Sequence, residues 1–128
     1  MPHALGAQAT MLWDGNIYIA GGFDGGGETN TLYAYDIAGD IWSTLAPMPQ
    51  ALYGPGCGAT NGKLYVAGGY AFGAVFNTSQ IYNIATNTWT TGPNVPQGMG
   101  YCGSTVFDDG TGEKLYLYGG VFNRTRGY

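Results

Sequence analysis

The feature that most constrains this chain is an internal repeat with a period of 47 residues. The segment MPHAL at residues 1–5 recurs as MPQAL at residues 48–52 and as VPQGM at residues 95–99. A second segment, GNIYIAGG, recurs as GKLYVAGG 47 residues later and as EKLYLYGG after a further 51, because four extra residues lengthen the preceding turn. Repeats of this length indicate stacked units that bury their apolar faces only against one another. The sequence therefore predicts units at residues 1–47, 48–94 and 95–128, the last one partial.

Turn residues and alternating apolar residues divide each unit into four short strands. In the first unit we expect strands near residues 7–13, 16–20, 32–35 and 41–45. The dipeptide between the first two strands is Asp-Gly in one unit and Asn-Gly in the next, which suits a two-residue type I′ hairpin turn. The 24 glycines disfavour helix, so the predicted fold class is all-β. Only the first two strands of the third unit are present.

Two aromatic residues follow each double glycine with the same spacing, as Tyr35 and Trp42 and again as Tyr82 and Trp89. Together with the registered copies, they make the chain closely resemble the kelch-repeat family over essentially its whole length. The resemblance implies a β-propeller of four-stranded antiparallel blades, with the first strand of each unit innermost. It also implies that these four rings are mostly buried between blades, so that Trp42→Ala or Trp89→Ala would cost about 3 to 5 kcal/mol.

The number of repeats predicts an incomplete ring. Propellers have roughly four to eight blades, whereas this chain supplies about two and a half. We expect open packing faces on the end blades and an unpaired apolar edge at residues 114–118. Additional blades would come from a longer chain or, as the alternative, from other copies in a composite ring.

One position departs from the kelch pattern. Many kelch proteins carry an Arg just before the first strand, where this chain has Leu5, Leu52 and Met99. Specificities that depend on that Arg are therefore not expected here.

Composition excludes some partners. The formal net charge is −4, with four basic residues and no basic stripe to neutralise phosphates, so nucleic acid is not expected as a partner. No apolar run approaches the ~20 residues of a membrane helix. Low charge and two sequons, Asn77-Thr78-Ser79 and Asn123-Arg124-Thr125, favour an extracellular or cell-surface origin.

Residues that could carry catalysis or bind metal are sparse. His3 is the single histidine, so neither a Ser-His-Asp triad nor an imidazole metal cluster is expected. Cys57 and Cys102 are interpreted as two buried thiols, with a disulfide as the alternative. The acidic segment at residues 108–113 lacks EF-hand spacing and is interpreted as a solvated turn. We predict no catalytic residue, no metal site and no cofactor.

The candidate binding surface is the set of loops at one end of the blades, where propellers usually bind. Aromatic residues beside a few polar ones suit a protein hot spot or a surface that stacks on sugars. The candidate residues are Phe23, Asp24, Tyr53, Tyr70, Phe72, Tyr101, Phe122, Arg124 and Arg126.

Two functional hypotheses follow. The first is a non-catalytic interaction scaffold that engages a protein or glycan partner through the loop face. The alternative is the propeller part of a carbohydrate-active enzyme, similar to galactose oxidase or to a sugar isomerase or mutarotase, whose catalytic residues lie outside this segment.

Overall fold

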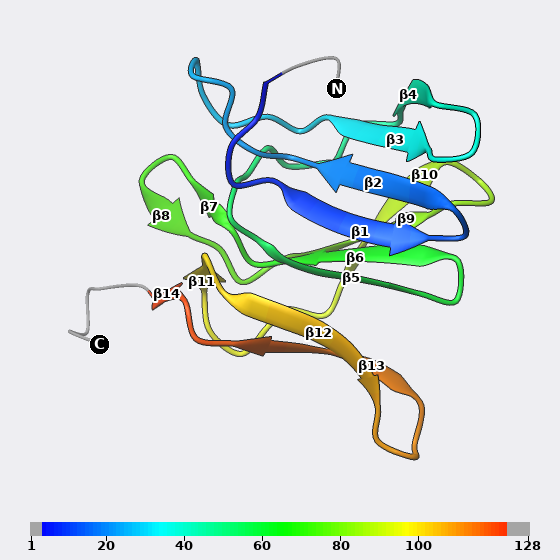
Figure 1. Ribbon diagram of the computed structural model, residues 1–128. Helices are drawn as coiled ribbons and strands as arrows, with labels where there is room; N and C mark the ends of the chain where they lie inside the picture. The colour runs from blue at the N-terminus through cyan, green and yellow to red at the C-terminus, as the bar shows by residue number, and fades with distance from the viewer. Residues whose placement is uncertain (1–3, 123–128) are drawn as a thin grey trace.

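The computed structural model describes residues 4–122, which contain strands and no helix (Figure 1). The first sheet has four antiparallel strands in chain order: β1 (Ala9–Trp13), β2 (Asn16–Ala20), β3 (Leu32–Asp36) and β4 (Ile41–Leu45). We call this sheet blade 1. The predicted all-β fold and the four-stranded antiparallel blade are confirmed.

Blade 2 repeats this arrangement with β5 (Gly56–Thr60), β6 (Lys63–Ala67), β9 (Ser79–Asn83) and β10 (Thr88–Gly92). A small hairpin of β7 (Tyr70–Ala71) and β8 (Ala74–Val75) lies between β6 and β9 in the chain. In the third unit, β12 (Gly103–Asp108) pairs with β13 (Glu113–Tyr118), and this hairpin is blade 3. Two short strands, β11 (Met99–Gly100) and β14 (Val121–Phe122), pair beside it.

The blades lie side by side through their first strands, since β5 contacts both β1 and β12. The first strand of each unit is therefore innermost, and the described residues form an arc instead of a closed ring (Figure 1). No helix in residues 4–122 is both long and apolar enough to cross a membrane.

The tight turns follow from the turn residues. Asp14 and Gly15 have φ values of 47° and 77°, and Asn61 and Gly62 have 50° and 72°, as a type I′ turn requires. The first strand of the first unit begins two residues later than predicted, at Ala9. Ala7 has a φ of 52°, which is incompatible with an extended strand.

The double glycine joins each blade to the next. Gly21 has a φ of 63°, and a Cβ on it would lie 2.5 Å from the Leu52 carbonyl oxygen of the following unit. The next amide, of Gly22, donates a 2.8 Å hydrogen bond to that same carbonyl. Gly69 donates in the same way to Met99, at 2.7 Å. Only glycine permits this approach, because any Cβ on Gly21 would collide with the neighbouring backbone.

The core lies between blades 1 and 2. Met11 and Tyr18 of blade 1 pack in one buried cluster with Leu64, Val66 and Tyr82 of blade 2. Along β1, the buried Met11 alternates with exposed Thr10 and Leu12, as the period of two requires.

The four repeated rings, predicted to be mostly buried, are covered to different degrees. Tyr82 is 1% exposed, but Tyr35, Trp42 and Trp89 are half-buried. Tyr35 and Trp42 are cross-strand partners on the face of blade 1 that points away from blade 2, so no described blade covers them. Trp89 packs against the core from the outermost strand, β10, where one side of the ring stays accessible.

The two cysteines are free, as interpreted, but half-buried instead of buried, because they lie on or beside the innermost strands. The Cys57 thiol donates to the Thr10 carbonyl oxygen at 3.6 Å, and the Cys57 amide donates to Ser104 Oγ at 3.1 Å. Thr10, Cys57 and Ser104 are repeat-equivalent positions, so this contact continues from blade to blade.

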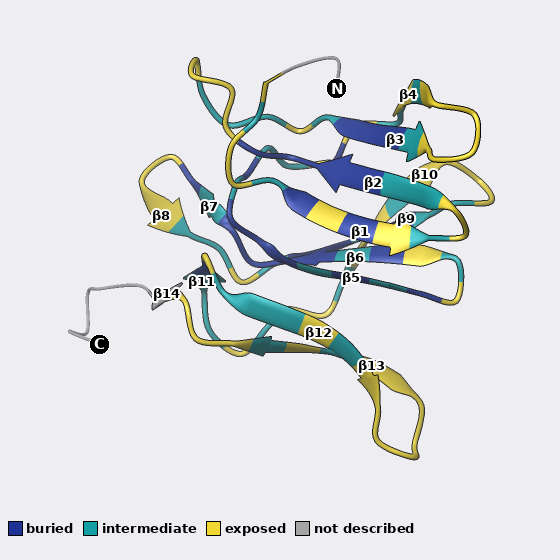
Figure 2. Cartoon of the chain, viewed as in Figure 1, coloured by how far each residue is buried: buried dark blue, intermediate teal, exposed yellow. Residues whose placement is uncertain are grey.

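Blade 3 is much less buried than the other two blades (Figure 2). No residue from 101 to 120 is fully buried. Its outward face exposes 60% of Phe107 and 59% of Tyr118, while the opposite end of the arc exposes 65% of Leu12 on blade 1. Both end blades thus have open apolar faces.

Candidate functional site

The loops between the second and third strands meet the linkers between units at one end of the blades, where β7, β8, β11 and β14 lie (Figure 1). Short backbone pairs join loop and linker in every unit. Gly6 pairs with Phe23, and Tyr53 pairs with Tyr70 in blade 2. The pairing of β11 with β14 is the equivalent in the third unit.

A second set of backbone hydrogen bonds runs between units at this end. The Gly54 amide donates to the Ala7 carbonyl oxygen, and the Tyr101 amide donates to the Gly54 carbonyl oxygen, both at 2.6 Å. The three residues are 47 apart and share left-handed φ values of 52°, 64° and 53°. For Ala7 and Tyr101, which have side chains, this conformation costs on the order of 1 to 3 kcal/mol each. We call this repeated arrangement the inter-unit ladder.

The ladder brings together four of the candidate rings. Tyr53 is central: its ring centroid lies 5.6 Å from Phe23, 5.4 Å from Tyr70 and 5.8 Å from Tyr101. Edge-to-face and tilted geometries at these distances are favourable for aromatic pairs. We call these four residues the aromatic cluster. Phe23 is 42% and Tyr101 54% exposed, so the cluster presents apolar surface to solvent.

A shallow pocket of about 340 Å³ opens on the cluster. Its lining consists of Gly6, Ala7, Phe23, Tyr53 and Tyr101, none of which carries a charge. The pocket thus offers aromatic faces, phenol hydroxyls and backbone groups to a ligand.

The electrostatics keep the central phenol neutral. Desolvation raises the pKa of Tyr53, and the neighbouring phenols of Tyr101 and Tyr70 raise it further. Glu28, nearby, accepts a 2.8 Å hydrogen bond from the Phe72 amide, and this bond lowers the Glu28 pKa. The carboxylate therefore stays ionised and tethers the loop of blade 1 to the β7–β8 turn of blade 2.

The remaining candidate residues lie outside the aromatic cluster. Asp24 Oδ1 accepts hydrogen bonds from the Gly26 and Gly27 amides, at 2.9 and 3.2 Å, and so shapes its own loop. Phe72 is 80% exposed at the tip of the β7–β8 turn. Phe122 belongs to β14, but its side chain, together with Arg124 and Arg126, lies outside the described residues.

Two contributors to the site were absent from the candidate set, Gly6 and Ala7 in the pocket lining. The 47-residue register contains a signal for Ala7, since it aligns with Gly54, where a glycine marks the left-handed position.

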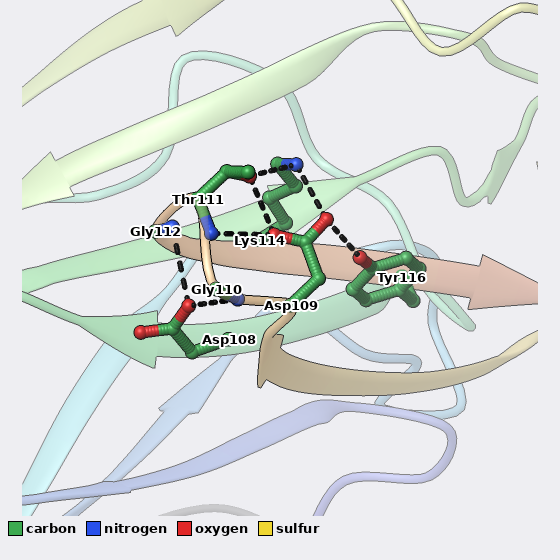
Figure 3. Close-up of polar contacts among 7 residues, drawn as sticks. All are labelled: Asp108, Asp109, Gly110, Thr111, Gly112, Lys114 and Tyr116. Atoms are coloured by element: carbon green, nitrogen blue, oxygen red, sulfur yellow. Dashed lines mark hydrogen bonds and ion pairs between the residues drawn. The ribbon is translucent and has the colours of Figure 1, made fainter.

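The acidic turn between β12 and β13 binds its own backbone (Figure 3). Asp108 Oδ1 accepts from the Gly110 and Gly112 amides, at 2.8 and 3.1 Å. Asp109 forms a 2.7 Å ion pair with Lys114, and this contact, followed by hydrogen bonds from Thr111, lowers its pKa to about 2. Among residues 4–122, no group of three or more His, Cys, Asp or Glu side chains is placed to hold a metal ion.

The comparisons with known proteins agree with this architecture. The family profile described as Kelch motif matches residues 9–49 and 51–96, which is more than half of the chain. The chain therefore belongs to the kelch-repeat family. No curated protein matches its sequence.

Among solved structures, the chain is similar to that of YjhT, with a TM-score of 0.81 over 94% of this chain. The chain spans 40% of the YjhT chain. At 19% sequence identity, this similarity shows a shared fold alone.

Proposed function

We propose that this chain is a non-catalytic binding scaffold that engages a protein or a glycan through its loop face. The observation that carries the proposal is the convergence of Phe23, Tyr70 and Tyr101, from three consecutive units, on Tyr53. Three of these four rings, those of Phe23, Tyr53 and Tyr101, line one open pocket. A ligand on this surface would contact three units at once.

The chemistry of the cluster favours recognition of a neutral, partly apolar group. Partly exposed tyrosines combine a large apolar face with a hydroxyl, which is why they are frequent in protein hot spots and suit stacking against a sugar ring. A volume of about 340 Å³ is at the lower end for ligand pockets, enough for one sugar ring or one large side chain.

The pocket lining also bears on the enzyme alternative. Glycoside hydrolysis typically uses a pair of carboxylates across the scissile bond. The carboxylate of Glu28, which acts on Tyr53, is engaged by the Phe72 amide, and the lining residues are aromatic, glycine and alanine. This favours binding over hydrolysis at this place.

A paired-variant experiment tests the proposal. The wild-type chain is screened by saturation-transfer NMR against neutral mono- and oligosaccharides, and by selection from a displayed peptide library. Tyr53→Ala removes the ring shared by all three aromatic contacts, whereas Phe107→Ala removes a similarly large, 60% exposed ring from blade 3.

We expect ligands selected on the wild type to lose at least about tenfold in affinity on Tyr53→Ala, as at a hot spot, and to be unaffected by Phe107→Ala. Circular dichroism checks that both variants are folded. Ligands that bind Tyr53→Ala as well as the wild type would show that the loop-face cluster is not the binding site.

A further inference from the structure

The turn of the β7–β8 hairpin carries a residue that its backbone conformation disfavours. Phe72 and Gly73 have φ values of 52° and 78°, which are those of a type I′ turn. A left-handed φ is unfavourable for a bulky side chain, because its Cβ comes too close to the backbone. Phe72 is nevertheless 80% exposed, so burial of the ring does not offset this cost.

Elsewhere the chain fills such positions with residues that suit them. At the other strand turns with a non-glycine residue at positive φ, that residue is always Asp or Asn: Asp14, Asp40, Asn61 and Asn87. Asp and Asn tolerate this conformation, because their short polar side chains bond to the local backbone. The repeat position of Phe72 in the first unit, 47 residues earlier, is Gly25, at a φ of 91°. The second unit therefore has an exposed phenylalanine where the repeat and the turn both favour another residue.

The base of this hairpin is held firmly by its neighbours. Tyr70 and Tyr53 exchange backbone hydrogen bonds of 2.8 and 3.0 Å. The Glu28 carboxylate, from blade 1, accepts its 2.8 Å hydrogen bond from the amide of Phe72 itself. Ala71, next to the turn, is 0% exposed. The Phe72 ring is thus presented to solvent from a fixed support.

The charge beside the ring is negative. Hydrogen bonds from backbone amides, that of Phe72 first, lower the pKa of Glu28, so its carboxylate is ionised at neutral pH. The basic residues within 4–122, Lys63 and Lys114, follow the β5–β6 and β12–β13 turns, at the opposite end of the blades from β7 and β8 (Figure 1). Among the residues that the structure describes, the loop face therefore carries acidic side chains and no basic one.

We propose that Phe72 anchors a folded protein partner, inserting its ring into an apolar recess whose rim carries a basic side chain next to Glu28. This inference rests on the proposed binding function of the loop face and narrows its partner to a protein. The ring protrudes from a turn, so only a surface that is itself concave encloses it, whereas a single sugar ring covers one face at most. Aromatic anchors held in place before binding are effective in protein interfaces, because little conformational entropy is lost on docking.

Phe72→Asn separates this role from a structural one. Asparagine keeps the backbone amide that donates to Glu28, and it suits the left-handed φ of a type I′ turn. The urea midpoint of unfolding should therefore rise, while the surface for the partner is lost. A lower midpoint than that of the wild type would show that the ring supports the fold, and it would overturn the proposal.

Binding is measured with defined probes. Proteins are selected against the full chain from a displayed library of repeat proteins with randomised concave surfaces. By surface plasmon resonance, we expect the selected proteins to lose about thirtyfold or more in affinity for Phe72→Asn, as at a hot spot. Phe107→Asn, the same change at a 60% exposed ring of blade 3, is the matched control and should bind them unchanged. Undiminished binding to Phe72→Asn would overturn the proposal.

Glu28→Gln tests the basic rim, since glutamine keeps an acceptor oxygen for the Phe72 amide and removes the charge. The affinity of the selected proteins should fall about fivefold at low salt, as for one exposed ion pair. The difference from wild type should disappear at about 1 M salt, because the charges are then screened. Equal affinities of wild type and Glu28→Gln at low salt would refute the assigned charge complementarity.

Tyr53→Ala distinguishes a failure of this proposal from a failure of the proposed function. Selected proteins that depend on Tyr53 but bind Phe72→Asn at full strength would support the aromatic cluster as the site and overturn the Phe72 anchor. Dependence on Phe72 without dependence on Tyr53 would support the anchor and count against the cluster. A saccharide that loses as much affinity on Phe72→Asn as the selected proteins do would overturn the assignment of a protein partner.

Discussion

The two tryptophans at equivalent repeat positions should differ in their contribution to stability. Trp89 packs against the core between blades 1 and 2, and its indole N–H donates a 2.7 Å hydrogen bond to the Ala46 carbonyl oxygen of blade 1. Trp42 has its closest ring contact with Tyr35 of the same blade, at a centroid distance of 4.9 Å. One ring thus joins two blades, whereas the other lies on an open face.

The expected magnitudes follow from these contacts. Full burial of a large aromatic side chain would make truncation to Ala cost about 3 to 5 kcal/mol, and a half-buried ring loses roughly half of that. For Trp89→Ala the lost indole hydrogen bond adds about 1 kcal/mol, for a total of about 2.5 to 3.5 kcal/mol. For Trp42→Ala only the half-buried ring is lost, without a hydrogen bond to another blade, so the expected loss is about 1.5 to 2.5 kcal/mol.

Urea titration followed by far-UV circular dichroism measures both losses, since this signal does not depend on the removed fluorophores. Trp89→Phe keeps most of the ring and removes the N–H, so it should cost about 1 kcal/mol. Equal losses for Trp42→Ala and Trp89→Ala, or a larger loss for Trp42→Ala, would refute the assignment of Trp89 to the blade boundary.

Three further changes test other parts of the fold. Gly21→Ala should destabilise the chain by more than about 2 kcal/mol, because the added Cβ would collide with the Leu52 carbonyl oxygen and alanine disfavours the positive φ. In the same denaturant titration, Gly25→Ala, at a φ of 91° with open space around it, should show the conformational cost alone. The folded-state pKa of Asp109 lies below its ordinary value of 3.8, so the ionised carboxylate stabilises the fold above about pH 4 and this effect is lost as the pH falls toward 2. The difference in unfolding free energy between wild type and Asp109→Asn should therefore shrink over that range, and a difference independent of pH would contradict the ion pair. Desolvation raises the pKa of the Cys57 thiol, so iodoacetamide should alkylate this thiol more slowly at neutral pH than it alkylates the thiol of an unstructured peptide. Equal alkylation rates would show that the Cys57 thiol is accessible and unperturbed.

The repeat predicted most of the architecture because local chemistry determines it. Asp14-Gly15 and Asn61-Gly62 encode their turns, and the double glycine at Gly21 marks where another backbone must approach closely. These features act within a few residues of the chain, or recur at a constant spacing. They could therefore be predicted from the sequence before any contact between units was known.

What could not be predicted depends on neighbours that are distant in sequence. Trp42 and Trp89 share one sequence pattern and differ in surroundings only because one faces another blade and the other does not. The convergence of the candidate rings on Tyr53 follows from the inter-unit ladder, whereas Phe72, equally aromatic and in a neighbouring loop, lies at an exposed turn. Sequence spacing alone does not separate these two outcomes.

Because the aromatic cluster draws Tyr101 from the least buried part of the fold, ligand occupancy and the docking of blade 3 should be thermodynamically linked. Blade 3 docks on blade 2 through β12, β13 and β5, so opening can begin at blade 3 without disturbing the boundary between the other two. Such an opening would remove one wall of the pocket. A ligand that binds the closed arrangement more tightly than the open one suppresses this fraying in proportion to its concentration. The exchange rate of the β12 amides would then report binding at a surface that those amides do not touch.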